Sequence, residues 1–179
     1  MAKLGLGFVA VAMAAVLMGP AMAHGPSRQK VVETIEINAP SDKVWAVVGN
    51  YKDMSWHPDI AKSEGMDGFE PEKTKRTLTF KKGGIVKDKL TKYEPEKPFI
   101  SFMTEEVDLK MLPVSGYSSY FTLTPAGDKT TVEWKGAFYR GYVNNDPPPE
   151  LSDKAAIEAV TAFQKAGLAA LKAKIEGGK

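Results

Sequence analysis

The chain contains no cysteine and only two histidines among its 179 residues. Without cysteine there can be no disulfide, no thiolate nucleophile, no thiolate metal site and no covalently attached c-type haem. The formal net charge is only +2, so the composition gives no reason to expect a nucleic acid partner. The sequence also lacks a phosphate-binding glycine loop, a nucleophile elbow and a zinc-protease motif. These absences leave few routes to catalysis.

A short apolar run lies near the N-terminus. Lys3 precedes an apolar segment over residues 4–18, and residues 21–23 read Ala-Met-Ala, a small-x-small form that signal peptidase cleaves. The run is shorter than the roughly 20 apolar residues needed to cross a bilayer. We therefore expect a cleaved signal peptide at residues 1–23, export to the periplasm, and one soluble domain at residues 24–179 with no membrane anchor.

Alternation of apolar and polar residues predicts seven β-strands, at residues 31–38, 60–65, 74–81, 85–93, 99–105, 116–124 and 130–140. Short turns join most of them, so strands that are neighbours in sequence should pair antiparallel. After the first strand we expect a helix with Ser41 as its N-cap, followed by a second short helical turn at residues 53–58 that Pro58 ends.

The register of one hairpin can be predicted from its turn. If residues 82–84 form a three-residue loop, Phe80 faces Val86 and Arg76 faces Leu90. Asp88 then lies diagonally from Arg76 on a mostly apolar face. Either a buried ion pair or a frayed edge would explain this placement.

The last segment has a clear helical period. Ser152 is the expected N-cap, and apolar residues recur at helical spacing as far as about Glu176. This apolar face needs a partner, and the sheet is the large one available. Gly167 lies in mid-helix, where it would either let the helix approach the sheet closely or leave room for a ligand. We predict an α+β fold in which a curved antiparallel sheet of about seven strands wraps around a long C-terminal helix.

Eight basic residues crowd the segment 73–92, and Glu105, Glu106 and Asp108 follow it. Such a run is typical of a solvated sheet face. The alternative is a docking surface for an acidic protein.

The order of elements, together with INAPSDKVWAVVGNYKDMSWHP at residues 37–58, resembles the START-like, Bet v 1-like and polyketide cyclase-like domains of the SRPBCC superfamily. The resemblance covers almost all of residues 24–179. It implies a helix-grip fold with a cavity between the sheet and the C-terminal helix.

Four segments resemble the periplasmic MxaD family more closely: AHGPSRQKVVETI, NYKDMSWHPDIAKSEG, LPVSGYSSYFTL and VEWKGAFYRGYVNNDPPPELSD. This resemblance implies an accessory of methanol oxidation that assists methanol dehydrogenase or its coupling to a c-type cytochrome. Because the sequence carries no catalytic motif, we expect this accessory to be non-enzymatic and to use no cofactor. Two alternatives stay open, a carrier of a small hydrophobic ligand and a cyclase-like enzyme.

His57 is the candidate for such an enzyme, because an unperturbed pKa near 6.5 suits a general acid or base. A structural histidine near the cavity mouth is the alternative reading. Side chains expected to line the cavity are Trp56, His57, Tyr117, Phe121, Trp134, Phe138, Arg140, Phe163 and Gly167.

The segment around Asn-Asn-Asp-Pro-Pro-Pro gathers aromatic, arginine and amide side chains, which are common in protein interfaces. Its candidate partner-binding residues are Tyr139, Tyr142, Asn144, Asn145 and Asp146, and a stiff connector is the alternative. His24 would be the first residue after signal cleavage and is a weak candidate copper ligand.

Overall fold

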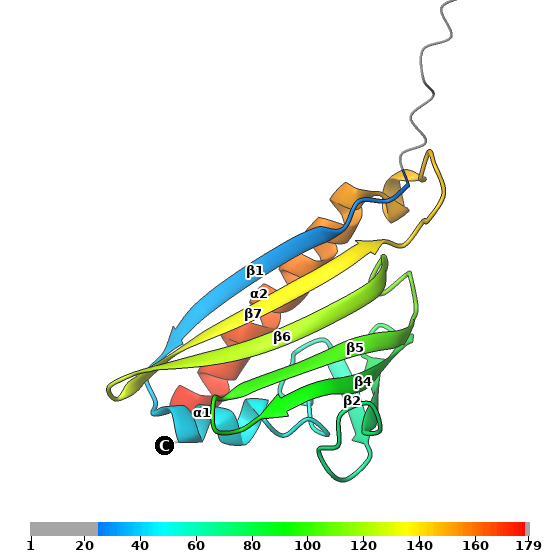
Figure 1. Cartoon of the computed structure of the whole chain (residues 1–179). Coiled ribbons are helices and arrows are strands. Elements are labelled where there is room, and N and C mark those ends of the chain that lie inside the picture. The colour runs from blue at the N-terminus through cyan, green and yellow to red at the C-terminus, as the bar shows by residue number, and fades with distance from the viewer. Residues whose placement is uncertain (1–24, 178–179) are drawn as a thin grey trace, which may run out of the picture.

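The computed structural model describes residues 25–177 of the chain. Seven strands form one antiparallel sheet in the order β1-β7-β6-β5-β4-β3-β2. Figure 1 shows the sheet bending along its length. The strands are β1 (Gln29–Ile37), β2 (Ile60–Gly65), β3 (Lys75–Phe80), β4 (Ile85–Glu94), β5 (Phe99–Val107), β6 (Val114–Ala126) and β7 (Lys129–Arg140).

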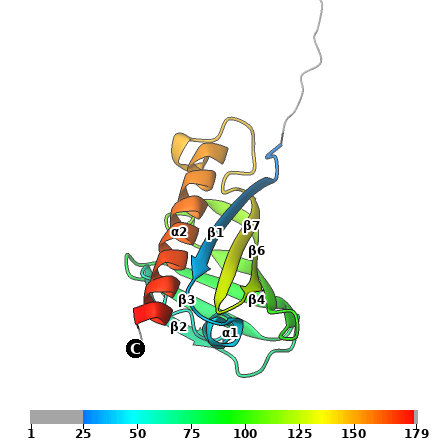
Figure 2. The same cartoon turned by 90° about the vertical axis from the view of Figure 1, so that its left-hand side faces the viewer.

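Three helical segments complete the fold: α1 (Ser41–Val48), η1 (Pro149–Leu151) and α2 (Asp153–Gly177). The long helix α2 lies along one face of the sheet and packs chiefly on β1 and β7 (Figures 1 and 2). Ser152 caps it as predicted, since its Oγ accepts a hydrogen bond of 3.2 Å from the Ala155 N–H. The predicted α+β fold, a curved antiparallel sheet against a long C-terminal helix, is confirmed.

Two local predictions around α1 are wrong. Pro40, not Ser41, is the N-cap residue, because the Pro40 carbonyl already accepts from the amides of Lys43 and Val44. Ser41 is the first residue inside the helix, and its buried Oγ has no hydrogen-bond partner within the described residues. Residues 53–58 form turns instead of a second helix, because proline disfavours helical backbone in the residue before it and so stops the segment after a single turn.

The hairpin between β3 and β4 also departs from its predicted register. The Phe80 N–H donates to the Gly84 carbonyl at 3.1 Å, so residues 81–83 form the loop. Gly83 and Gly84 both have positive φ, +90° and +80°, which lets the chain reverse one residue earlier than expected. Arg76 therefore pairs directly with Asp88 across the two strands.

Candidate functional site

The space between α2 and the sheet is filled by aromatic side chains of the protein itself. His57 stacks on Phe163 with ring centroids 4.0 Å apart, and Trp134 lies 4.4 Å from Phe121. His57 and Trp134 are both fully buried. Trp56 joins the same cluster, with its ring 6.3 Å from those of Phe121 and Trp134. Five of the predicted cavity residues thus form one packed aromatic cluster.

Gly167 lets α2 approach this cluster. A Cβ atom placed on Gly167 would lie 2.5 Å from His57 Cδ2 and 2.6 Å from Trp134 Cζ3, both closer than atoms can pack. Of the two roles predicted for this glycine, the structure shows the close approach of helix to sheet. The His57 and Trp134 rings occupy the space beside Gly167 that was predicted, as the alternative, to hold a ligand.

Both ring nitrogens of His57 are engaged by the backbone. Nε2 lies 2.9 Å from the Phe163 carbonyl, to which it donates, and Nδ1 accepts from the Asp59 N–H at 3.1 Å. These bonds define a neutral ring protonated at Nε2. Burial lowers the pKa of His57 below its usual range, which also favours the neutral form. In this arrangement neither nitrogen is free to exchange a proton with a substrate.

Tyr117 and Phe138 lie beside this cluster and pack edge to face, with ring centroids 5.8 Å apart. The Tyr117 hydroxyl is 3.3 Å from the Gln164 side-chain amide on α2. Burial raises the pKa of Tyr117 to about 12, so this hydroxyl stays protonated at neutral pH. The tyrosine therefore ties β6 to the helix through a neutral hydrogen bond.

A small cavity remains inside the grip. It offers about 20 Å³ to the centre of a water molecule, roughly the space one water needs. Three predicted residues, Tyr117, Trp134 and Phe163, border it. The others that border it come mainly from β3, β4 and β5 and were not predicted as site residues: Met54, Arg76, Leu78, Phe80, Val86, Asp88, Phe102, Thr104 and Leu112.

The polar wall of this cavity is the ion pair between Arg76 and Asp88. The two side chains are only 4% and 3% exposed, and Arg76 Nη2 lies 3.0 Å from Asp88 Oδ2. Thr104 Oγ1 donates to the other carboxylate oxygen at 2.9 Å. The guanidinium group lies over the rings of both Tyr51 and Phe102, 4.5 Å and 4.3 Å from their centroids. Sequence left this pair as one of two possibilities, and the structure shows that it is buried.

Arg140 does not face the interior cavity, although it was predicted to. It ends β7, and its guanidinium group donates to the carbonyls of Tyr142 and Asn144, each at 2.8 Å, and to Asp153 Oδ2 at 2.9 Å. Alternation places Arg140 on the inner face, but the strand ends there and the loop that follows supplies oxygen acceptors. Arg140 therefore fixes the conformation of the proline-rich loop.

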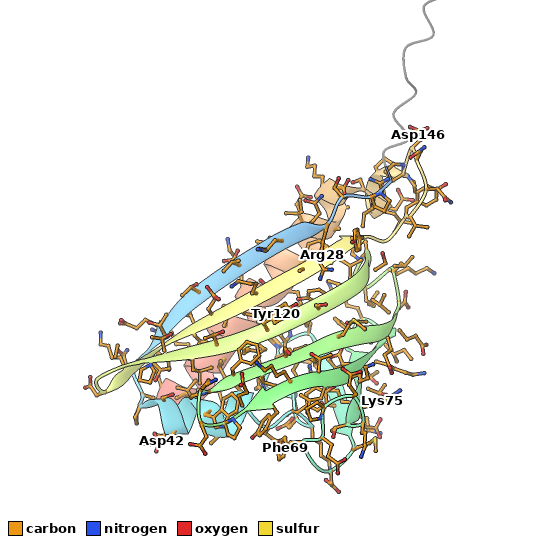
Figure 3. The ribbon with its side chains drawn as sticks, in the orientation of Figure 1. Arg28, Asp42, Phe69, Lys75, Tyr120 and Asp146 are labelled. Carbon is orange, nitrogen blue, oxygen red and sulfur yellow. The ribbon has the colours of Figure 1, made fainter. Side chains whose placement is uncertain are left out.

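This loop, residues 141–148, is exposed at one end of the molecule. Figure 3 shows Asp146 there, at the same end as Arg28. Asn144, Asn145 and Asp146 are exposed, whereas Tyr139 and Tyr142 are half-buried. Val143 is 58% exposed, the largest value among the exposed large hydrophobic residues. The five predicted partner-binding residues thus lie in or beside one loop that Arg140 holds in shape.

A surface groove of about 380 Å³ lies beside α2, outside the packed interior. Phe80, Leu112 and Phe163 border both this groove and the small cavity, so these three side chains separate the two spaces. The remaining groove residues are Asp59, Lys81, Lys82, Lys110, Met111, Ala159 and Ala162.

The predicted signal peptide at residues 1–23 and the candidate copper ligand His24 lie outside the described residues. Between residues 25 and 177, no group of three His, Cys, Asp or Glu side chains is arranged to hold a metal ion. Neither α1 nor α2, the two α-helices of that region, combines the length and hydropathy needed to cross a membrane.

Solved structures with similar folds include the protein XoxI from Bacillus cereus, with 22% identity, a TM-score of 0.68, and 82% of this chain and 95% of that chain covered. A second is the Zhui aromatase/cyclase from Streptomyces sp. R1128, with 16% identity, a TM-score of 0.62, and 85% of this chain and 93% of that chain covered. A third is a START superfamily protein from Mycobacterium smegmatis, with 16% identity, a TM-score of 0.66, and 84% of this chain and 99% of that chain covered. At these identities the likeness shows the fold alone.

No curated protein matches the chain. The family model described as "Polyketide cyclase / dehydrase and lipid transport" matches residues 28–176, which is nearly the whole described domain. The chain therefore belongs to the polyketide cyclase/dehydrase and lipid transport family.

Proposed function

We propose that this protein is a non-enzymatic accessory of periplasmic methanol oxidation, which binds methanol dehydrogenase or its c-type cytochrome. The observation that carries the proposal is the filled interior. His57 has both nitrogens bonded to backbone, and the remaining cavity of about 20 Å³ is far smaller than the 300–1,000 Å³ typical of ligand sites. Because side chains fill the interior, we place the binding function on the surface of the protein.

The choice of partner comes from the MxaD-like segments, among which residues 132–153 include the exposed proline-rich loop. The three hydrogen bonds from Arg140 and the three consecutive prolines at 147–149 hold this loop before any partner arrives. A loop that is already ordered loses less conformational entropy on binding. Loop residues 141–148 are thus the proposed contact surface.

The experiment is a binding titration of the purified protein with methanol dehydrogenase and with the cytochrome in low-salt buffer. The Val143→Asp variant should weaken the complex at least about tenfold if the loop is the contact, since a hot-spot residue contributes 1–2 kcal/mol or more. Val32→Asp is the matched control, because Val32 is also an exposed valine (43%) but lies on β1. Absence of binding to both proteins, with normal methanol oxidation in a deletion strain, would refute the proposed function.

A second candidate, carriage of a small hydrophobic ligand, is favoured by one observation. The side chains of Phe80, Leu112 and Phe163 border both the groove and the interior cavity. Rotation of these side chains would join the two spaces. Native mass spectrometry of protein isolated from the periplasm would detect such a ligand as an added mass, and the bare polypeptide mass in every preparation would rule carriage out.

A further inference from the structure

The basic cluster predicted to be either a solvated face or a docking surface is neutralised on the sheet itself. Along β3 and β4, lysines on the face opposite α2 each meet a glutamate within 2.8 Å. The pairs are Lys75–Glu105, Lys87–Glu106, Lys89–Glu72 and Lys92–Glu94. This face presents alternating charges and offers little net attraction to an acidic partner.

Three lysines behave differently. Lys81 and Lys82 lie in the β3–β4 turn and Lys110 lies between β5 and β6, and no carboxylate of residues 25–177 is within 4.0 Å of their ammonium groups. All three are exposed and all three border the groove beside α2. Asp59 is the single acidic residue on that border. The free positive charge of this region is thus concentrated at the rim of one groove.

The groove has an apolar floor beneath this rim. Phe80 from β3, Phe163 from α2, and Met111 and Leu112 from the β5–β6 connection line it. The combination of an apolar floor and a cationic rim is complementary to a segment that carries both apolar side chains and carboxylates.

The walls of the groove are held by close contacts between the β3–β4 hairpin and the β5–β6 connection. The Asp108 N–H donates to the Ile85 carbonyl at 3.0 Å. A Cβ on Gly84, which has positive φ, would lie 2.6 Å from the Met111 side-chain Cγ and 2.7 Å from Asp108 Oδ2, so the turn packs directly on these side chains. At the other end of that connection, the Gly141 N–H donates to the Pro113 carbonyl at 2.8 Å. The segment that carries Lys110 is thus held from both sides, and the rim is in place before a partner binds.

The groove also continues toward the proline-rich loop. A second hollow of about 500 Å³ shares Lys110 with the first and is bordered by Leu109, Pro113, Glu150 and Leu151. Glu150 and Leu151 belong to η1, which follows the loop directly. The two hollows meet at Lys110, and together they define a path from the β3–β4 turn to η1, the segment that follows the proposed partner-binding loop.

We propose that this path, bordered by Lys81, Lys82 and Lys110, receives an acidic segment of the partner protein whose apolar side chains rest on Phe80, Leu112 and Phe163. This inference rests on the proposed function and names the second surface and the chemistry of its partner. The apolar floor favours a segment with its own apolar side chains over a purely charged one. The unpaired ammonium groups select carboxylates over cationic segments.

The test uses the full protein without its signal peptide and two probes. The first is purified methanol dehydrogenase or its cytochrome. The second is a synthetic peptide of alternating glutamate and leucine, compared with a matched peptide of alternating lysine and leucine. NMR shifts of backbone amides report where each probe binds, and titrations report affinity at low and high salt.

The expected result is that the acidic peptide shifts amides around residues 80–84, 108–113 and 159–163, while the basic peptide does not. The triple variant Lys81→Glu, Lys82→Glu, Lys110→Glu should weaken binding of both probes at least about tenfold and reduce the salt dependence. Lys87→Glu, from the paired face, is the control and should change affinity less than about twofold.

Failures of the two proposals are distinguishable. If the partner binds the triple variant as tightly as the wild type, the groove inference is overturned while the proposed function stands. If neither partner protein binds, the proposed function fails, and the groove inference is then decided by the acidic peptide. If the acidic peptide shifts no backbone amide along the groove, protein docking there is refuted. The fatty acid dodecanoate serves as a further probe, and its binding in the groove without binding of the peptide would also refute protein docking.

Discussion

At the scale of single residues, Gly167 and His57 determine how closely the helix meets the sheet. Gly167 accepts the His57 and Trp134 rings where a Cβ would stand. His57 in turn links the turn before β2 to α2, because its Nε2 donates to the Phe163 carbonyl while its Nδ1 accepts from the Asp59 N–H within the turn. The two residues depend on each other. The His57 ring fits only because Gly167 has no Cβ, and without that ring the space beside Gly167 would be an unfilled void.

Gly167→Ala should destabilise the protein even though alanine is the better helix former. The added methyl group would clash with two buried rings, and overpacking of this kind costs about 1–3 kcal/mol, against a propensity gain of about 1 kcal/mol. Urea unfolding measures the difference. The control is Ala169→Gly on the exposed side of α2, which should lose about 1 kcal/mol from propensity alone. A clear stabilisation by Gly167→Ala would show that the space above Gly167 is open.

His57 should make stability depend on pH. Its pKa is lowered in the folded protein, so the unfolded chain binds the proton more readily. The contribution is fully present above the unfolded pKa of about 6.5 and is lost as pH falls through 6.5 toward the folded value. The free energy of unfolding of the wild type minus that of His57→Gln should therefore decrease between pH 7.5 and pH 5.5. A difference that stays constant over this range would contradict the burial of a neutral ring.

At the scale of elements, the β3–β4 hairpin carries a charged pair into the core. Asp88→Asn should destabilise the protein by about 3–5 kcal/mol, because it leaves the Arg76 charge buried without a counter-charge. Chemical denaturation provides the measurement. Glu106→Gln removes one member of an exposed pair on the neighbouring strand and should change stability by less than about 0.5 kcal/mol. Equal effects of the two substitutions would mean that the Arg76–Asp88 pair is solvated.

The same hairpin shows why the sequence predicted the elements better than their registers. Alternation identifies a half-buried strand, and all seven predicted strands overlap an observed one. Alternation does not say where a turn with two consecutive glycines reverses, so the predicted register placed Asp88 diagonally from Arg76 instead of directly opposite it. The position of Arg140 was predicted wrongly for a similar reason. Alternation shows which face of a strand a residue lies on, but not where the strand ends and its last side chain bonds to the following loop. The residues of the aromatic cluster could be picked out from the sequence, because large apolar side chains at inward-facing positions are nearly always buried in the core.

At the scale of the whole molecule, three side chains keep the interior closed to the groove. Phe163→Ala should join the two spaces, because Phe163 borders both and also stacks on His57. We expect the neutral dye N-phenyl-1-naphthylamine to bind this variant with enhanced fluorescence and to leave the wild type unchanged. The control Phe69→Ala removes an exposed ring that borders neither the groove nor the interior cavity, and this variant should not bind dye. Dye binding by the wild type would show that the interior already admits small apolar molecules.

The protein's own rings occupy the space between α2 and the sheet, and the function that we propose therefore lies on the outer surface. A crystal structure of the protein purified from its native host tests this most directly. We predict His57 and Trp134 packed against Gly167, with electron density for at most one water in the cavity beside Arg76. Continuous density of an elongated molecule between α2 and the sheet would contradict the account.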